Sequence, residues 1–278
     1  MELLPVVVPG QAIYYLLIDE TRDRWIAPHI RDNRMWEAAE TSLFLRLVQP
    51  GDRVVDVGAH VGYFTILFSR LCGENGFVHA FEPEPANHRL LRANLLVNDC
   101  RNVEALQFAL SDGAGSAQLY LSADNSGDHR LQFSEGRSSL GVSTVELDTV
   151  IGEGRVDIIK MDAQGAEPRI LAGMQKLVAR ERAHLCVLME FSPGLIARDG
   201  SVAAFAAQLD ALGARVCAVS LSGEGPKARV SLQAGATTAE LLRMLAERLA
   251  RDGYVDASAN LLVFFSTEAQ SAHMTRLG

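Results

Sequence analysis

The sequence reads Arg53-Val-Val-Asp-Val-Gly-Ala-His-Val-Gly-Tyr-Phe-Thr65 and, further on, Val78-His-Ala-Phe-Glu-Pro83. The first stretch begins as a buried apolar strand, breaks at Gly58 and resumes with the pattern of a helix after Gly62. Glycines at such a turn let the backbone approach a ligand, and the helix start offers free N–H groups. The second stretch is a strand that ends in the carboxylate of Glu82, which is placed to accept the hydroxyls of a ribose. Together the two stretches predict a site for a nucleoside-like cofactor.

The turn residues also indicate which cofactor binds. A dinucleotide site requires the pattern G-x-G-x-x-G, and Gly58-Ala-His-Val-Gly62 lacks the middle glycine. Asp56 precedes the turn, and its carboxylate would repel a pyrophosphate but attract an ammonium group. S-adenosylmethionine (SAM) has a ribose, an ammonium and a sulfonium but no phosphate, so the pattern favours SAM over NAD. The alternative is that Asp56 is a structural hydrogen-bonding residue and Glu82 a solvated strand end.

Composition excludes several classes of protein. The net charge of −8 argues against a broad basic surface for nucleic acid. The chain shows no secretory leader and no apolar run near the ~20 residues that span a bilayer. Its four cysteines are widely spaced with no C-x-x-C pattern, so we expect neither disulfides nor a zinc site. These features are typical of a cytoplasmic protein that binds neither membrane nor nucleic acid.

Strand and helix patterns alternate along the chain, which predicts a Rossmann-like α/β fold: a three-layer sandwich around a mostly parallel seven-stranded sheet. Ligands of such sheets bind at the carboxyl ends of the strands. The expected strands cover 53–57, 77–82, 103–109, 156–161, 185–190, 214–221 and 261–265, and the expected helices 62–72, 85–98, 166–180, 201–212 and 238–251.

Two regions depart from this alternation. Residues 1–50 form an expected N-terminal extension of a domain covering 51–278, with a strand near 11–19 and a helix over 35–48. Its apolar residues 3–8 leave open whether they pack on their own domain or on a second copy in a homo-oligomer. Two further short strands, 117–122 and 141–147, are expected to flank a long mobile loop. If that loop folds over the site, His129 would reach the substrate.

The chain resembles the FkbM family of SAM-dependent methyltransferases, within the seven-stranded class I methyltransferase fold. The resemblance covers about residues 35–195, and the pattern K-x-D-x-x-G-x-E is its family-specific part. The motifs that carry it are Asp56-Val-Gly-Ala-His-Val-Gly-Tyr-Phe64, Phe81-Glu-Pro83, Ala109-Leu-Ser-Asp112 and Asp157-Ile-Ile-Lys-Met-Asp-Ala-Gln-Gly-Ala-Glu167.

The resemblance implies three groups of cofactor-binding residues. The amino acid end of SAM would lie at the glycine turn, the ribose at Glu82 beside Pro83, and the adenine next to Ala109 and Leu110. The turn residues concerned are Asp56, Gly58, Ala59, His60 and Gly62.

Two positions differ from the family pattern. The family usually has asparagine at His60, and a neutral histidine retains the ability to donate and accept a hydrogen bond. It usually has glutamate at Gln164, and the neutral amide there argues against a base at that position.

Methyl transfer is an in-line displacement in which the enzyme holds the acceptor close to the methyl group. A hydroxyl acceptor also benefits from a base that removes its proton. Asp162, at the end of the fourth core strand, is the first candidate base, Glu190 the second and Glu167 the third. Each has a structural alternative, which for Glu167 is a favourable interaction with its helix dipole.

The leading functional hypothesis is O-methylation of a hydroxyl on a small-molecule acceptor, such as a sugar or a secondary metabolite. N-methylation and a non-catalytic SAM-binding module are the alternatives. We expect no metal ion, because no spacing of the carboxylates demands one. Selectivity for the acceptor is expected to lie in residues 1–50, 122–140, 192–200 and 222–237.

Overall fold

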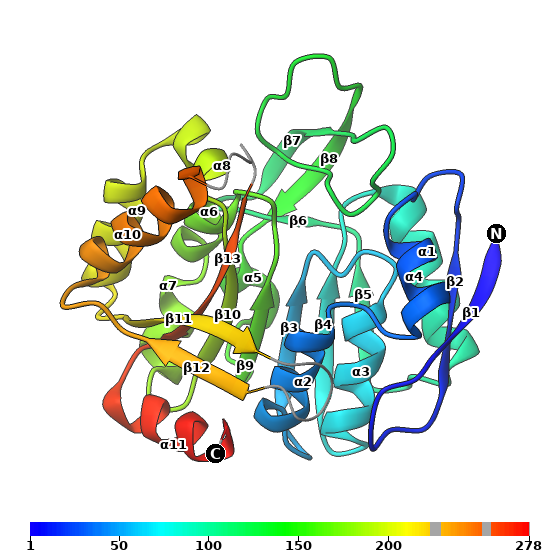
Figure 1. Ribbon diagram of the computed structural model, residues 1–278, viewed down its shortest axis with the longest axis horizontal. Coiled ribbons are helices and arrows are strands. Elements are labelled where there is room, and N and C mark those ends of the chain that lie inside the picture. The colour runs from blue at the N-terminus through cyan, green and yellow to red at the C-terminus, as the bar shows by residue number, and fades with distance from the viewer. Residues whose placement is uncertain (223–228, 252–256, 278) are drawn as a thin grey trace.

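The structure is a computed structural model that describes residues 1–222, 229–251 and 257–277. Within these residues the central sheet has eight strands (Figure 1). In spatial order they are β12 (Arg229–Gln233), β11 (Arg215–Ser222), β13 (Ala259–Phe264), β10 (Cys186–Phe191), β9 (Ile158–Met161), β3 (Arg53–Val57), β4 (Phe77–Phe81) and β5 (Val103–Leu106).

The strand order confirms the expected α/β fold. The strands from β5 to β10 are parallel, and β13 lies antiparallel between β10 and β11. Apart from this inserted strand, the order is the doubly wound one that reverses beside β3, and a ligand crevice is expected there. The eighth strand, β12, was not expected and extends the edge at β11.

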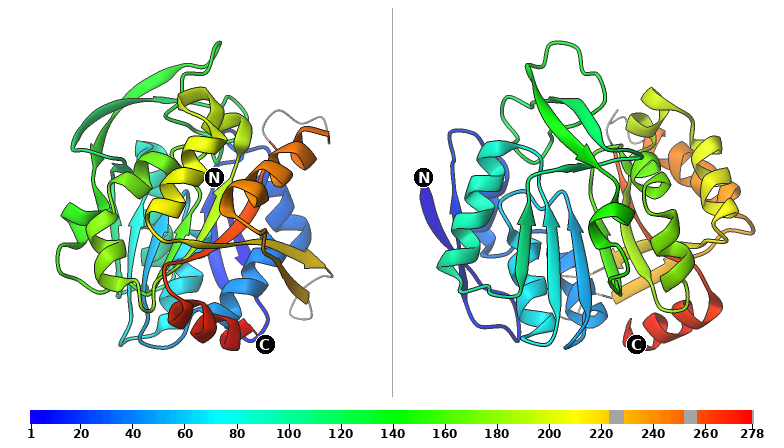
Figure 2. Two further views of the ribbon diagram at one scale, coloured as in Figure 1. Left: turned by 90° about the vertical axis from the view of Figure 1, so that its left-hand side faces the viewer. Right: turned by 180° about the vertical axis from the view of Figure 1, so that it is seen from behind.

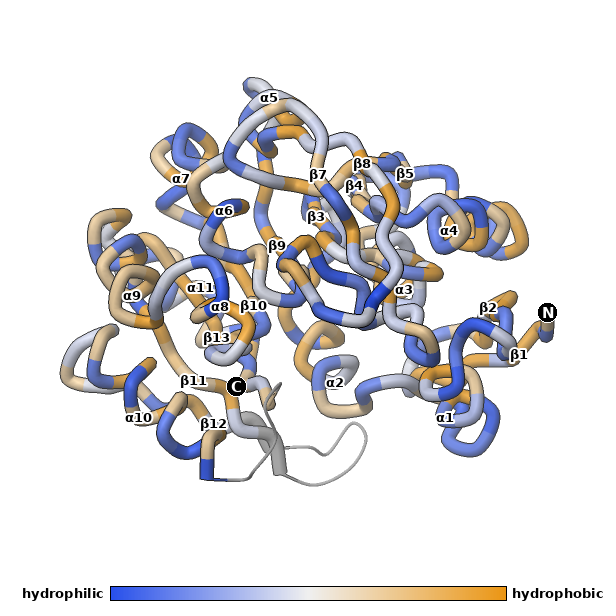
Figure 3. The backbone as a smooth tube through the Cα atoms, turned by 90° about the horizontal axis from the view of Figure 1, so that it is seen from above, coloured by the Kyte–Doolittle hydropathy of each residue, from blue (hydrophilic) through white to orange (hydrophobic). Residues whose placement is uncertain are grey.

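Helices cover both faces of the sheet and give it two hydrophobic cores. Figure 3 shows hydrophobic residues concentrated in the central strands, whereas the outer helices alternate in hydropathy. One face carries α2 (Ala38–Leu47), α3 (Tyr63–Cys72), α4 (Pro85–Val97) and α11 (Thr267–Leu277). The other carries α5 (Leu147–Ile151), α6 (Glu167–Ala172), α7 (Gln175–Glu181), α8 (Pro193–Asp199), α9 (Val202–Ala211) and α10 (Thr238–Arg251).

The chain begins with an antiparallel hairpin of β1 (Glu2–Val6) and β2 (Tyr14–Ile18), followed by α1 (Ile26–Asn33). Its inward residues, among them Leu4 and Val6, are buried in the core that includes α3 and α4. Leu3 and Val7 point outward and are exposed. Residues 3–8 therefore pack on their own domain through alternate side chains.

Both outer edges of this hairpin are occupied. Asn94 of α4 and Asn98, which caps the end of that helix, each bond to a backbone N–H and a carbonyl of β2, at Leu17 and Tyr15 respectively. On β1, the N–H of Val7 donates to the carbonyl of Arg34 at 2.8 Å, and Pro5 has no N–H to offer.

Two expected elements are divided. The strand expected over 103–109 ends at Leu106, and residues 109–110 form β6 in a separate sheet with β7 (Gly115–Tyr120) and β8 (Ser139–Val145). The helix expected over 166–180 breaks into α6 and α7 at Gly173. A Cβ at Gly173 would lie 2.0 Å from the carbonyl oxygen of Ser111, so this close packing depends on glycine.

Figure 2 shows the small sheet and its long loop above the ends of the parallel strands.

Helices α8 and α11 were also not expected. No helix in the described ranges is long and apolar enough to cross a bilayer. Of the segments expected to set acceptor selectivity, 223–228 lies outside the described residues.

Candidate active site

A cavity of about 750 Å³ opens at the carboxyl ends of β3, β4, β9 and β10. It brings together all the predicted site residues except Gly62, which lies in the adjoining turn, and the third candidate base, Glu167. The predicted residues that line it are Asp56, Gly58, Ala59, His60, Glu82, Pro83, Ala109, Leu110, Asp162 and Glu190.

The glycine turn after β3 lines the part of the cavity where the cofactor was expected. The N–H groups of Gly58 and Ala59 both donate to the carbonyl of Phe81 at 3.0 Å, which ties the turn to the end of β4. Gly58 has φ +76°, and a Cβ there would lie 2.0 Å from the carbonyl oxygen of Asp162. A glycine at this position lets the ends of β3 and β9 approach each other, and so places the turn beside Asp162.

Replacing Gly58 by alanine is expected to lower the free energy of unfolding by about 3–5 kcal/mol, because left-handed strain adds to the clash with backbone. Gly10 is a matched control, since its φ is +78° and no described atom would lie within 4 Å of an added Cβ. Gly10→Ala should cost only about 1–2 kcal/mol. Urea unfolding of both variants measures the difference, and equal losses would contradict the role of the close contact.

Asp56 is fully buried at the wall of the cavity. The hydroxyl of Thr65 donates to its Oδ2 at 2.6 Å, while Oδ1 has no partner among the described residues. Burial raises the pKa of Asp56, although the charge of Lys160 opposes this shift. A buried carboxylate oxygen without a partner favours a cation nearby, which agrees with the ammonium group expected here.

Glu82 lies at the end of β4 and is 5 % exposed. Its Oε2 accepts the N–H of His60 at 2.8 Å and its Oε1 accepts the N–H of Glu84 at 2.9 Å. Burial raises the pKa of Glu82 to about 7. The two backbone bonds fix the orientation of a carboxylate that still has free lone pairs for hydroxyl donors.

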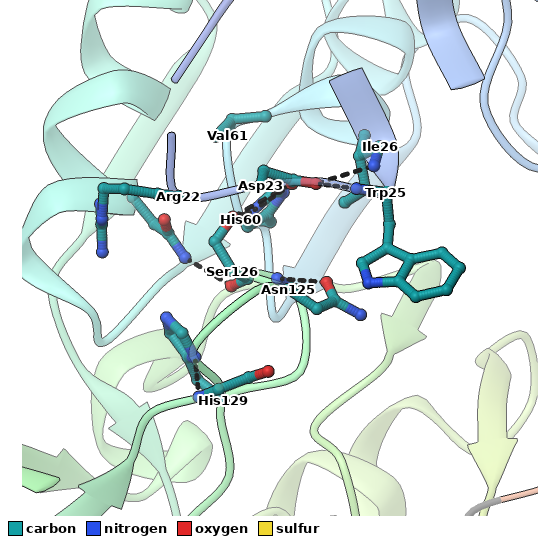
Figure 4. A network of polar contacts seen from close by, with 12 residues as sticks. Arg22, Asp23, Trp25, Ile26, His60, Val61, Asn125, Ser126 and His129 are labelled. Carbon is teal, nitrogen blue, oxygen red and sulfur yellow. Dashed lines mark hydrogen bonds and ion pairs between the residues drawn. The ribbon is translucent and has the colours of Figure 1, made fainter. Parts of the chain in front are cut away.

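The loop between β7 and β8 closes over the cofactor end, and its residues 125–131 line the cavity. His129 is among them, as expected if the loop folds over the site. Its Nδ1 accepts the N–H of Ser122 at 3.1 Å, and burial lowers the pKa of His129 to about 4. Figure 4 shows the contacts that this loop makes with the segment before α1.

Charged and amide groups meet where β9 and β10 border the cavity. The Nζ of Lys160 lies 3.2 Å from Oδ2 of Asp162. The amide nitrogen of Gln164 donates to Oδ1 of Asp162 at 2.8 Å and to Oε2 of Glu190 at 3.0 Å. Burial opposes ionisation of Asp162, but the charge of Lys160 and the hydrogen bonds to its carboxylate together outweigh this effect and lower the pKa. Burial and the charge of Asp162 raise the pKa of Glu190 well above its ordinary value. The two carboxyl groups therefore differ in their affinity for a proton.

Sequence reasoning missed Glu37, which also lines the cavity. It precedes α2 with φ +41°, a conformation that residues other than glycine rarely adopt. Burial, and then the charge of Glu40, raise its pKa well above the ordinary value. Both residues lay within an ordinary amphipathic helix pattern, which gave no signal of a site.

Glu167, the third candidate base, is fully buried and does not line the cavity. Its Oε1 accepts the N–H of Ala163 at 3.0 Å, and burial raises its pKa to about 7. This contact ties Glu167 to the turn after β9, which is a different structural role from the helix-dipole interaction expected as its alternative.

A family model described as the methyltransferase FkbM domain matches residues 56–216, more than half of the chain. The chain belongs to the FkbM methyltransferase family. This confirms the resemblance, and with it a SAM-dependent methyltransferase domain of class I fold.

Two relatives are similar to this chain in sequence. The 31-O-demethyl-FK506 methyltransferase FkbM of Streptomyces tacrolimicus is 30% identical over 161 residues, which cover 46% of this chain and 61% of that protein. This FkbM-family chain thus spans about three fifths of that relative's length. Methyltransferase sdnD of Sordaria araneosa is 24% identical over 206 residues, which cover 62% of this chain and 76% of sdnD.

Solved structures are more distant. The methyltransferase FkbM of Methylobacillus flagellatus KT has a TM-score of 0.44 and 12% identity, covering 89% of this chain and 62% of that one. Precorrin-6y C5,15-methyltransferase of Geobacter metallireducens GS-15 has a TM-score of 0.45 and 14% identity, covering 83% and 87%. The fold assignment therefore rests on the strand order and the family model.

The residues of this FkbM-family site fit SAM. The partnerless oxygen of Asp56 suits its ammonium, the oriented carboxylate of Glu82 suits its ribose, and Leu110 offers an apolar surface at the cavity wall. Among the described residues, no group of three or more histidine, cysteine, aspartate or glutamate side chains is arranged to hold a metal ion.

Proposed function

We propose that this chain methylates a hydroxyl group of a small-molecule acceptor, a sugar or a secondary metabolite, rather than nucleic acid. The observation that carries the proposal is the pair of carboxyl groups, Asp162 and Glu190, joined by Gln164 at the end of the cavity away from Glu82. The name of the Streptomyces relative, a 31-O-demethyl-FK506 methyltransferase, supports an oxygen acceptor.

The proposal also assigns residues to the parts of the cofactor. Asp56 and the glycine turn at Gly58 would hold the amino acid part of SAM, Glu82 its ribose, and Ala109 with Leu110 its adenine. When bound, SAM supplies the electrophilic methyl group. The enclosing loop with residues 125–131 excludes water from the reacting atoms.

We assign different tasks to the two carboxyl groups. Asp162 is held as an anion by Lys160, so its low pKa makes it a weak proton acceptor. Burial and the charge of Asp162 raise the pKa of Glu190, which makes its carboxylate the stronger proton acceptor of the two, and Gln164 fixes its Oε2. In the proposed reaction the Glu190 carboxylate takes the proton of the acceptor hydroxyl, while Asp162 orients Gln164.

One experiment separates this proposal from its alternatives. The purified protein is incubated with isotope-labelled SAM and a panel of polyols, amino sugars and hydroxylated polyketides, and products are identified by mass spectrometry and NMR. A labelled O–CH₃ group supports the proposal. A labelled N–CH₃ group favours N-methylation. Tight SAM binding with no labelled product from any acceptor, in a panel that includes hydroxylated extracts, favours a non-catalytic module.

The rate with a hydroxyl acceptor is expected to rise with pH. Below its raised pKa the Glu190 carboxyl holds a proton and cannot accept another, so activity appears only as the pH increases through that value. Because burial raises the pKa of Glu82 to about 7, kcat is measured at saturating SAM, where cofactor affinity no longer contributes. Glu190→Gln should remove this ascending limb, and an identical limb in the variant would contradict the assignment.

A further inference from the structure

A chain of hydrogen bonds joins three segments that lie far apart in the sequence (Figure 4). Ser126 Oγ, in the loop over the cavity, lies 2.7 Å from His60 Nε2 of the glycine turn. The same hydroxyl lies 3.1 Å from Oδ2 of Asp23, in the segment before α1. Ser126 is 5 % exposed and Asp23 is 1 % exposed, so water does not compete for these bonds.

The direction of each hydrogen bond follows from which of the groups can donate. A carboxylate only accepts, so the single proton of Ser126 points to Asp23. The oxygen of Ser126 then accepts a hydrogen bond from the ring, which requires the Nε2–H tautomer of His60. Burial lowers the pKa of His60 to about 4, so the ring is neutral at pH 7. The chain therefore runs from His60 through Ser126 to Asp23.

The chain of hydrogen bonds is anchored at Asp23 and at Ser126. Oδ1 of Asp23 accepts the N–H groups of Trp25 and Ile26, at 2.9 and 2.7 Å, which fixes the carboxylate at the start of α1. The side chain of Asn87 donates to the carbonyl of Ser126 at 2.9 Å, which fixes the loop against α4.

The chain of hydrogen bonds affects the cofactor site through the backbone of His60. This residue has φ +51°, a left-handed conformation that is unfavourable for a side chain with a Cβ. In this conformation its N–H donates to Oε2 of Glu82 at 2.8 Å. The hydrogen bond to Ser126 holds the imidazole, and with it the strained turn, in place.

We infer that Ser126 and Asp23 are positioning residues for the cofactor: through His60 they fix the glycine turn against Glu82 and hold the loop with residues 125–131 over the bound nucleoside. The two residues act without touching the reacting atoms. This inference rests on SAM as the cofactor, and the alternative is that the same bonds only stabilise the fold.

The tautomer of His60 tests the chain of hydrogen bonds without any cofactor. In protein labelled with ¹⁵N-histidine, the His60 signal is assigned by its loss in His60→Asn, and its two ring nitrogens report which one carries the proton. We expect a proton on Nε2 in the wild type. In Asp23→Asn the amide donates to Ser126, which reverses the chain, so the proton should move to Nδ1. A wild-type Nδ1–H tautomer, or no change in the variant, would overturn the inference.

Calorimetry tests the consequence for SAM. Ser126→Ala is expected to weaken SAM binding about tenfold, the effect of one lost buried hydrogen bond, while Ser126→Thr retains a hydroxyl and should restore affinity. Ser122→Ala is the matched control, because its half-buried hydroxyl in the same loop bonds to Asp124 and to no other residue that the structure describes. Wild-type affinity in Ser126→Ala would overturn the inference. Absence of SAM binding to the wild type would instead overturn the cofactor assignment and leave the tautomer result intact.

Discussion

Glu190→Gln is expected to slow methyl transfer to a hydroxyl acceptor by about 10²- to 10⁴-fold, the usual contribution of a general base. SAM affinity should stay close to that of the wild type, because Glu190 lies at the far end of the cavity from Glu82. Glutamine also resembles the protonated form that the raised pKa of Glu190 favours, so the fold should tolerate it. Single-turnover assays at saturating SAM measure the chemical step.

Asp162→Asn is the companion variant. It leaves the buried cation of Lys160 without its partner at 3.2 Å, so we expect a loss of stability as well as of activity. Glu190→Gln should lower the rate with little change in the unfolding midpoint, whereas Asp162→Asn should lower both. If Glu190→Gln retained full activity and Asp162→Asn lost it without loss of stability, Asp162 would be the base.

Glu82→Ala is expected to weaken SAM binding about 100-fold, because two hydrogen bonds between a carboxylate and the ribose hydroxyls would be lost. The carboxylate also holds the N–H groups of His60 and Glu84, so part of the loss comes from the turn itself. Glu82→Gln keeps one oxygen and an amide, and should give an intermediate affinity. Calorimetry with SAM measures both variants.

A ligand pair separates the ribose contact from the effect on the turn. Wild-type protein should bind S-adenosylhomocysteine more tightly than its 2′-deoxy analogue, and Glu82→Ala should bind the two almost equally. Full discrimination in the variant would show that another residue holds the ribose. Glu104→Gln, which replaces an exposed glutamate on β5, serves as the control for a lost charge.

Local signals account for the parts of this structure that the sequence predicted. The strand β3 has the residue bounds expected for 53–57, because a short apolar run ended by Gly58 has few alternative conformations. The helix over 238–251 is also as expected, since its leucines recur with helical spacing. The cofactor end of the site follows from these local patterns and from the ends of adjacent parallel strands.

The parts that were missed depend on contacts between distant segments. The helix expected over 166–180 divides at Gly173, where the carbonyl of Ser111, distant in sequence, packs against the backbone. Ser126 is one polar residue in a polar loop, and Asp23 one acidic residue in a segment without a period. Their roles arise when folding brings both to His60, so no local pattern distinguishes them from solvated residues.

The hairpin of β1 and β2 carries apolar side chains on both faces, which makes it a hazard for aggregation by strand addition. Its edges remove that hazard. The side-chain amides of Asn94 and Asn98 bond to the backbone of β2 at positions that a third strand would use. On the other side, Pro5 interrupts the row of donors that an incoming chain would need. The protein can therefore leave Leu3 and similar residues facing solvent without offering a template on which further molecules could polymerise.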